Sequence, residues 1–249
     1  MPVLLLAQLS PSTLQYVILG VAALTGLAVL MHIYFQMKRS EDLEVIATEL
    51  GMAFSAKEDS RLLNKLQFFP TFRLGHTSNM KNVMQMATEH GLLSVFEYSY
   101  SKKDRLTDQK YLATTDRREF KTRTYHFTFA TLEIPEFLCP HFSVRPQGFM
   151  DETLSNGMQD INFPYHPVFS NSFLLCGQDE QGIRHFFDNE LMNLFATKRN
   201  AYVEAGNDVV ALRLKGRQKL EDIKKFIAEA DEFLGGFKHC SADPANQLV

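Results

Sequence analysis

The sequence contains no tryptophan, and only three of its 249 residues are cysteine. Cys139, Cys176 and Cys240 are odd in number, lie far apart and form no C-x-x-C pair, so they predict neither a disulfide framework nor a zinc site. A reducing cytoplasm fits this cysteine usage. An excess of basic residues is also missing, because 26 Lys and Arg stand against 29 Asp and Glu. This balance argues against a nucleic-acid-binding protein, which is usually basic.

The usual signatures of catalysis and cofactor binding are missing as well. The sequence has no G-x-S-x-G elbow, no P-loop and no G-x-G-x-x-G turn. None of the eight histidines pairs with another at i+3 or i+4 on an expected helix, and there is no H-E-x-x-H. We therefore expect no cofactor and no metal site, and a binding protein is favoured over an enzyme.

Charge is entirely missing from one stretch near the N-terminus. Residues 16–35 contain no Lys, Arg, Asp or Glu. As a helix this run spans about 30 Å, the thickness of the hydrocarbon core of a bilayer. A cleaved secretory signal is the rival interpretation, but the basic n-region is missing, the run is too long and no A-x-A site follows it. The sequence therefore predicts a transmembrane helix over residues 16–37.

The residues that flank this run predict how the chain crosses the membrane. No charged side chain precedes the run, whereas Lys38 and Arg39 follow it directly. Basic residues remain on the cytoplasmic side of a span. We therefore expect a single-pass protein of the cell inner membrane. Its N-terminus (residues 1–15) lies outside the cytoplasm, its domain (residues 38–240) lies inside, and its tail (residues 241–249) is disordered.

Downstream of the run, the spacing of apolar residues changes from helical to strand-like. Leu43, Ile46 and Leu50 fall at helical spacing, so close to the apolar run that the two can form one helix. Alternating residues over 92–100 and 122–133 predict two strands that pair as a long hairpin.

Three further elements complete the expected domain. Residues 179–197 carry an apolar stripe typical of a single helix. A second hairpin is expected over 201–214, around the turn pair Gly206 and Asn207, and a last helix over 217–234. Runs of strands with helices at their ends indicate an α+β fold. The prediction is thus an N-terminal transmembrane helix followed by a soluble domain with a mainly antiparallel sheet and flanking helices.

One segment, residues 160–180, combines polar and aromatic side chains densely. Asp160, His166 and Asp179 lie among its aromatic residues, and they are the candidate catalytic residues if the domain is an enzyme. A general base must reach its partner within about 2.6–3.2 Å or through one water, so an enzyme requires Asp160 and His166 to lie side by side. The alternative is that these polar groups satisfy the local backbone around Pro164.

A basic segment occupies the connection between the two strands of the long hairpin. Residues 101–123 contain eight basic and four acidic side chains. On a domain tethered to the inner leaflet, such a segment can contact anionic lipid. The alternative is a solvated hairpin tip. The candidate lipid contacts are Lys102, Lys103, Arg105, Lys110, Arg117 and Arg118.

Several short runs in the domain share a pattern with other sequences. Residues 142–146 read Phe-Ser-Val-Arg-Pro, residues 160–163 read Asp-Ile-Asn-Phe, and residues 177–180 read Gly-Gln-Asp-Glu. With the strand at 95–100, these runs resemble a family of uncharacterised bacterial single-span membrane-anchored proteins. The resemblance covers most of residues 50–235. It implies no activity, so no catalytic residue follows from it.

These observations favour one function and leave two alternatives. The leading hypothesis is a non-enzymatic scaffold or binding module at the inner membrane face, with the membrane and a protein as its partners. The first alternative is a membrane-tethered enzyme of unknown reaction. The second is a domain that contacts anionic lipid through the basic segment.

Overall fold

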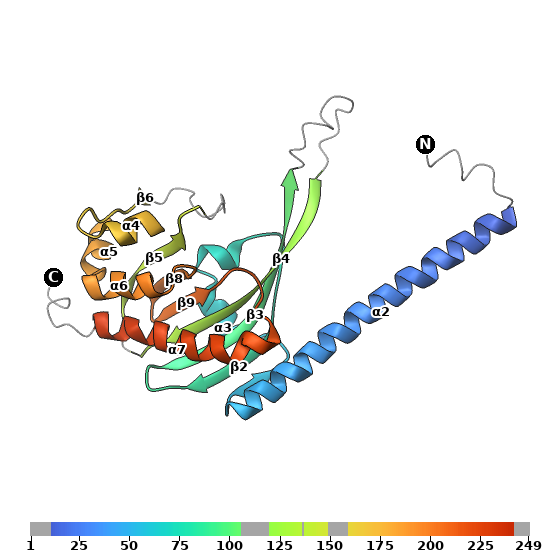
Figure 1. Ribbon diagram of the computed structural model, residues 1–249, viewed down its shortest axis with the longest axis horizontal. Helices are drawn as coiled ribbons and strands as arrows, with labels where there is room; N and C mark the ends of the chain where they lie inside the picture. The colour runs from blue at the N-terminus through green and yellow to red at the C-terminus, as the bar shows by residue number, and fades with distance from the viewer. Residues whose placement is uncertain (1–10, 106–119, 136, 149–158, 242–249) are drawn as a thin grey trace, which may run out of the picture.

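A single long helix leads directly into the domain. Helix α2 (Pro11–Glu49) is continuous over 39 residues, as the spacing of its apolar residues allowed. Its apolar N-terminal part extends away from the domain, and its C-terminal end lies against the domain (Figure 1). Leu43 and Ala47 are fully buried there. The computed structural model describes residues 11–105, 120–135, 137–148 and 159–241.

Helix α2 is long and apolar enough to cross a membrane, and none of its most apolar window is buried within the domain. Among the described helices it is the one candidate for a span. The predicted span of residues 16–37 lies within it. Of the other expected segments, residues 1–10 and the tail from residue 242 lie outside the described part of the chain.

The domain is built on one antiparallel sheet, which confirms the predicted α+β class. The described strands lie in the order β1-β2-β3-β4-β9-β8-β5-β7-β6, and each described pair is antiparallel. Their bounds are β1 (Ala53–Ser55), β2 (Thr77–Ala87), β3 (Leu92–Arg105), β4 (Phe120–Glu133), β5 (Cys139–Pro146), β6 (Gln159–Asp160), β7 (Phe173–Gly177), β8 (Tyr202–Asn207) and β9 (Val209–Arg213).

Helices cover the sheet from both sides and give the domain two apolar cores. The larger core lies between the sheet and helices α2, α4, α5, α6 and α7. The smaller core lies on the other face, under α3 and the 3-10 helix η1, and contains most of the aromatic side chains of β3 and β4. The remaining helices are α3 (Ser60–Leu66), η1 (Pro70–Arg73), α4 (Pro167–Ser172), α5 (Glu180–Phe186), α6 (Asn189–Thr197) and α7 (Leu220–Ser241).

The prediction of a single helix over residues 179–197 is wrong, because the chain forms two short helices there. Helix α5 ends at Phe186 and α6 begins at Asn189. The Oδ1 atom of Asp188 accepts a hydrogen bond from the Leu191 amide at 2.7 Å. An aspartate that caps a helix start has non-helical backbone, so it interrupts the helix before it. Both helices nevertheless bury their apolar residues in the larger core.

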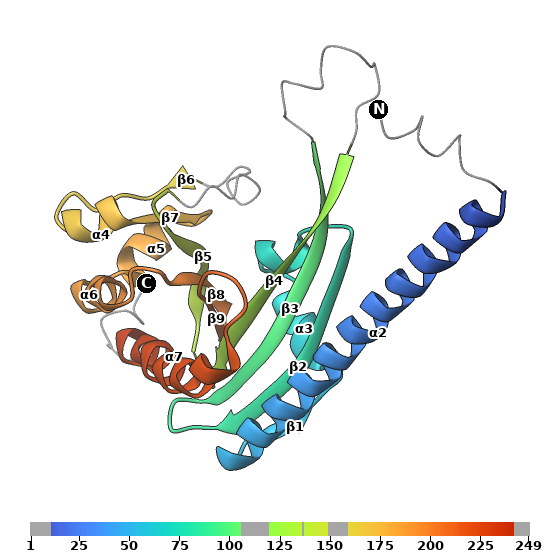
Figure 2. The same ribbon diagram turned by 45° about the vertical axis from the view of Figure 1, so that its right-hand side comes forward.

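Both predicted hairpins are present. Strands β3 and β4 pair from Leu92 with Glu133 as far as Arg105 with Phe120, so this hairpin is longer than the alternation indicated. The β8–β9 hairpin turns at Asn207, which has a φ of 56°. The far end of the β3–β4 hairpin and the N-terminal part of α2 point to the same side of the domain (Figures 1 and 2).

Candidate functional site

A cluster of polar and charged side chains joins α2 to the sheet. We call these residues the junction cluster: Arg39, Asn82, Glu97 and Arg217. Glu97 on β3 is 4% exposed. Its Oε1 atom accepts from Arg39 Nε at 2.7 Å and from Arg217 Nε at 2.6 Å, and its Oε2 atom accepts from Arg217 Nη2 at 2.5 Å and Asn82 Nδ2 at 2.8 Å. One buried carboxylate thus connects the long helix, two strands and the loop before α7.

An irregularity in β2 places Asn82 for this role. The pairing of β2 with β3 shifts register between Lys81 and Met84, and Asn82 has a φ of 53°. Asparagine is one of the few residues that adopts this left-handed conformation readily. Its Nδ2 atom donates to Glu97, while its Oδ1 atom accepts from the Ser40 hydroxyl at 2.6 Å. The side-chain amide of Asn82 at the bulge therefore connects Glu97 of the sheet to Ser40 of α2.

Burial and the neighbouring charges shift the pKa values of three groups in and beside the cluster. Burial raises the pKa of Glu97, but the hydrogen bonds and charges of Arg217 and Arg39 outweigh it and hold that pKa below its ordinary value. Burial lowers the pKa of Lys81, and the charges of Arg217 and Arg39 lower it further, against the opposing effect of Glu97. The pKa of His126 is lowered by burial, by Arg217 and by Lys81.

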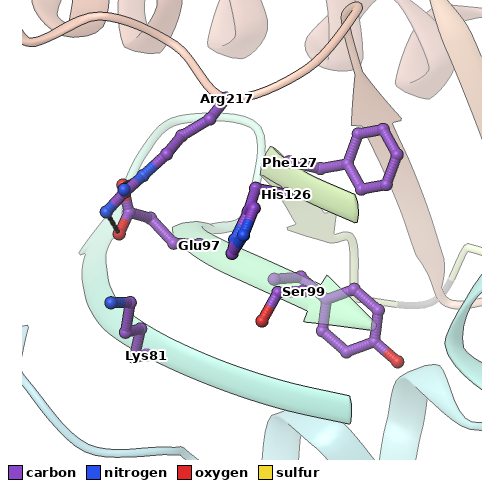
Figure 3. Close-up of a pocket in the computed structure, with 7 residues that line it drawn as sticks. Lys81, Glu97, Ser99, His126, Phe127 and Arg217 are labelled. Carbon is purple, nitrogen blue, oxygen red and sulfur yellow. Dashed lines mark hydrogen bonds and ion pairs between the residues drawn. The ribbon is translucent and has the colours of Figure 1, made fainter. Parts of the chain in front are cut away.

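A shallow hollow of about 10 Å³ opens beside the cluster. Figure 3 shows Arg217 paired with Glu97, with Lys81 and His126 close to them. The Nζ atom of Lys81 donates to Gln36 Oε1 of α2 at 2.5 Å. The residues that line the hollow are Lys81, Glu97, Tyr98, Ser99, His126, Phe127 and Arg217.

A larger cleft of about 270 Å³ lies between the α3–η1 segment and strands β5 and β8. Three phenylalanines and one histidine are among its nine lining residues, and the rings of Phe68 and His141 pack with their centroids 4.8 Å apart. Arg73, Ser143 and Gln178 add polar groups to the apolar lining. The complete lining is Phe68, Phe69, Pro70, Arg73, His141, Phe142, Ser143, Gln178 and Ala205.

Two buried ionisable side chains, Glu204 and Arg213, lie close to this cleft. Glu204 pairs in register with Ser143, and its Oε1 atom accepts from the Thr71 amide at 3.2 Å. Burial raises its pKa to about 7, and the hydrogen bonds of Thr71 and the charge of Arg213 offset only part of this effect. The Arg213 guanidinium carbon lies 4.4 Å from the ring centre of Phe127 and 4.0 Å from that of Tyr202.

The raised pKa of Glu204 predicts how stability depends on pH. The carboxyl stays protonated in the folded state up to about pH 7, whereas the unfolded chain releases this proton near pH 4.5. The free energy of unfolding therefore falls as pH rises through this window, by about 3 kcal/mol from this one group. We expect Glu204→Gln to remove that part of the pH dependence, measured by urea unfolding of the full chain in detergent at pH 5 and pH 8.

The quantity compared is the difference in the free energy of unfolding between pH 5 and pH 8. A loss of stability that is equal at both pH values therefore does not affect the comparison. Asp231 on α7 serves as the matched control, because its Asp231→Asn variant removes a partly buried carboxylate on the opposite side of the sheet. An equal pH dependence in wild type and Glu204→Gln would show that Glu204 does not titrate in this window.

Two of the three candidate catalytic residues, His166 and Asp179, accept hydrogen bonds from nearby backbone amides. His166 Nδ1 accepts from the Phe169 amide at 3.2 Å, and its Nε2 lies 3.1 Å from Asn193 Oδ1. Asp179 Oδ1 accepts from the Gly182 amide at 2.9 Å and caps α5.

Asp160 is exposed on β6 and accepts from the Asn162 side chain at 3.1 Å. Within the described ranges, no hydrogen bond joins Asp160, His166 and Asp179 to one another. In the same ranges, no group of three or more His, Cys, Asp or Glu residues is arranged to hold a metal ion.

The candidate lipid contacts fall at the end of the β3–β4 hairpin. Lys102 and Lys103 lie on β3, where Lys103 is exposed and Lys102 is partly buried. Arg105 is the last residue of β3. Lys110, Arg117 and Arg118 lie outside the described residues.

The residues that matter most at the junction were not identified from the sequence. Glu97 lies 58 residues from Arg39 and 120 from Arg217, so no local pattern connects them. One signal was available, because Glu97 shares a strand face with the apolar residues Leu93 and Val95. A carboxylate on a buried strand face requires a partner. The sequence does not indicate which residue that partner is.

The structure is thus that of an α+β domain joined to one long apolar helix, which is a candidate membrane anchor. No protein-family model and no curated protein sequence matches the chain. Among solved structures, the fold is similar to that of the mycobacterial trehalose monomycolate transport factor A, TtfA, with a TM-score of 0.53 and 10% identity. The match covers 81% of this chain and 93% of that one. At this identity the likeness shows the fold alone.

Proposed function

We propose that the protein is a membrane-anchored, non-enzymatic binding module at the cytoplasmic face of the inner membrane. The observation that carries the proposal is the continuity of α2 from its apolar run into the domain, where Arg39 is held by Glu97. Lys38 and Arg39 directly follow the apolar run and favour a cytoplasmic domain.

The continuity of the helix argues for a module whose orientation matters. The apolar run ends at Phe35, and Leu43 is already fully buried in the domain, so only two turns of helix separate bilayer and core. A domain that needed only to be near the membrane would be served by a flexible linker. A rigid connection instead presents one face of the domain at a constant angle to the bilayer.

The aromatic cleft is the candidate binding site of this module. Its volume of about 270 Å³ is close to the lower end of the range for ligand pockets, roughly 300 Å³. Phenylalanine and arginine, here Phe68 and Arg73, are among the residue types enriched at protein interfaces. The protein of similar fold is a transport factor, which is compatible with a non-enzymatic module.

Membrane anchoring predicts the behaviour of two versions of the chain. The full chain is expected to stay in the membrane pellet after an alkaline carbonate wash, because the exposed apolar run of α2 is buried in lipid. A chain that begins at Lys38 lacks the run but keeps Arg39, and it is expected in the supernatant. Release of the full chain by carbonate would contradict the anchor, and a C-terminal reporter active only in the periplasm would contradict the orientation.

A photo-crosslinking residue placed in the cleft tests the binding role. Arg73 is exposed at the cleft, whereas Lys225 is exposed on α7 at the opposite face of the sheet. In membranes we expect a discrete crosslinked product from position 73 and none from position 225. Equal products from both positions, or none from either, would contradict the cleft as a protein-binding site.

A further inference from the structure

The contact between α2 and β2 fixes where the membrane surface meets the domain. The apolar run of α2 ends at Phe35, and the next residue, Gln36, accepts a hydrogen bond from Lys81 Nζ at 2.5 Å. Arg39 follows within one turn and binds Glu97. If α2 crosses a bilayer, as the proposed function requires, the amine of Lys81 lies at the level of the lipid headgroups.

Positive charge exceeds negative charge around the hollow at this level. Both oxygens of Glu97 are already used by Arg39, Arg217 and Asn82. The described partner of Lys81 is the neutral amide of Gln36. One carboxylate therefore faces three cationic side chains, so the site has an uncompensated positive charge.

The pKa directions support the same conclusion. Burial is the largest cause of the lowered pKa values of both Lys81 and His126, and the charge of Arg217 acts in the same direction, against the opposing charge of Glu97. A bound anion would oppose the effect of Arg217.

The strand register shows that polar groups continue from the hollow along the hairpin. Ser99 lies opposite His126, and Ser101 lies opposite Thr124 with their hydroxyl oxygens 2.9 Å apart. These residues alternate with Tyr98, whose ring belongs to the smaller core on the other face. The face of the hairpin that carries Glu97 is therefore polar and hydroxyl-rich beyond the junction.

The hollow thus lies where an apolar surface meets a polar one. Helix α2 and the β3–β4 hairpin diverge from the junction on the same side of the domain (Figures 1 and 2). The helix offers exposed apolar side chains, such as Ile33 and Phe35, and the hairpin offers cations and hydroxyls. A phospholipid has the matching pattern, with acyl chains next to an anionic phosphate.

From this arrangement we infer that Lys81, His126 and Arg217 hold, across the mouth of the hollow, the phosphate of an anionic phospholipid from the leaflet that α2 enters; the hollow itself has room for about one water. The acyl chains of that lipid lie along α2, and the hydroxyls of Ser99 and Ser101 face its headgroup. The inference rests on the proposed membrane anchoring and adds a lipid class to it. The proposed site lies where the β3–β4 hairpin passes the junction cluster. It does not include the basic residues at the far end of the hairpin.

Native mass spectrometry of the full chain in mild detergent tests the inference. The probes are dioleoyl phosphatidylglycerol and, as the zwitterionic comparison, dioleoyl phosphatidylcholine. We expect the protein to retain phosphatidylglycerol preferentially. Because a basic residue near the headgroups contributes about 1 kcal/mol, Lys81→Gln should lower that preference about fivefold. His126→Gln is the second variant and should have a smaller effect at pH 7, because its imidazole is mostly neutral there.

Lys224→Gln is the matched control. Lys224 pairs with Glu49, which lies about 20 Å further along α2 than Gln36, away from the headgroup level. This variant should keep the wild-type preference. A denaturation midpoint within a few degrees of wild type establishes that Lys81→Gln is folded.

Three results would overturn the inference. The first is an equal retention of the two lipids by wild type, and the second is an unchanged preference in Lys81→Gln. The third is displacement of the lipid by millimolar inorganic phosphate, which would make the hollow a site for a free anion. The carbonate wash separates this inference from the proposed function, because a protein that stays in the pellet but shows no lipid preference is anchored without this site.

Discussion

Glu97→Ala is expected to lower the free energy of unfolding by about 3–5 kcal/mol. The carboxylate is almost completely buried and accepts hydrogen bonds from two arginines and one amide. Removing one partner of a buried ion pair leaves the other charges without compensation in a site of low dielectric constant, which is the source of the large cost. In Glu97→Ala, both Arg39 and Arg217 lose the carboxylate that compensates their charge.

Thermal and urea unfolding of the full chain in detergent, followed by the near-ultraviolet signal of the domain tyrosines, measures the effect. Glu97→Gln serves as the second variant, because it keeps the shape of the side chain and removes only the charge. The matched control is Glu49→Gln, whose salt bridge to Lys224 also connects α2 to the domain but is half exposed on both sides. Exposed pairs contribute about 0–1 kcal/mol, so the control should change little. A loss below 1 kcal/mol in Glu97→Ala would show that the junction cluster does not stabilise the docking of α2.

Phe187→Ala is expected to cost about 3–5 kcal/mol, the typical range for removal of a buried aromatic ring. Phe187 is 1% exposed, and its ring centre lies 4.9 Å from that of Phe142 and 5.7 Å from that of Phe169. It occupies the break between α5 and α6, where both helices and strand β5 meet. The truncation therefore leaves a cavity that several rigid elements border and that they cannot easily close.

The measurement is the urea midpoint of the full chain in detergent at constant pH. Tyr165→Ala is the control, because this ring is 64% exposed, although it also contacts Phe163. The control should lower stability by less than about 1 kcal/mol. If both variants have the wild-type midpoint, Phe187 is not part of a cooperative core.

The sequence by itself determined the elements that depend on local pattern. The uncharged run of residues 16–35 predicts a long apolar helix, because membrane-spanning length and composition are properties of one continuous segment. Alternation over β3 and β4 predicts their pairing, since a period of two places one set of side chains on each face. Two expected hairpins with helices before, between and after them are enough to indicate an antiparallel α+β fold.

Only the tertiary structure decided which side chains meet across those elements. Asp188 ends one helix and begins another within an apolar stripe that is equally consistent with a single helix. The pairing of Glu97 with Arg39 and Arg217 depends on where α2 docks and where the chain enters α7. Removal from water is what makes these contacts strong, and burial is a property of the packed domain that no local spacing encodes.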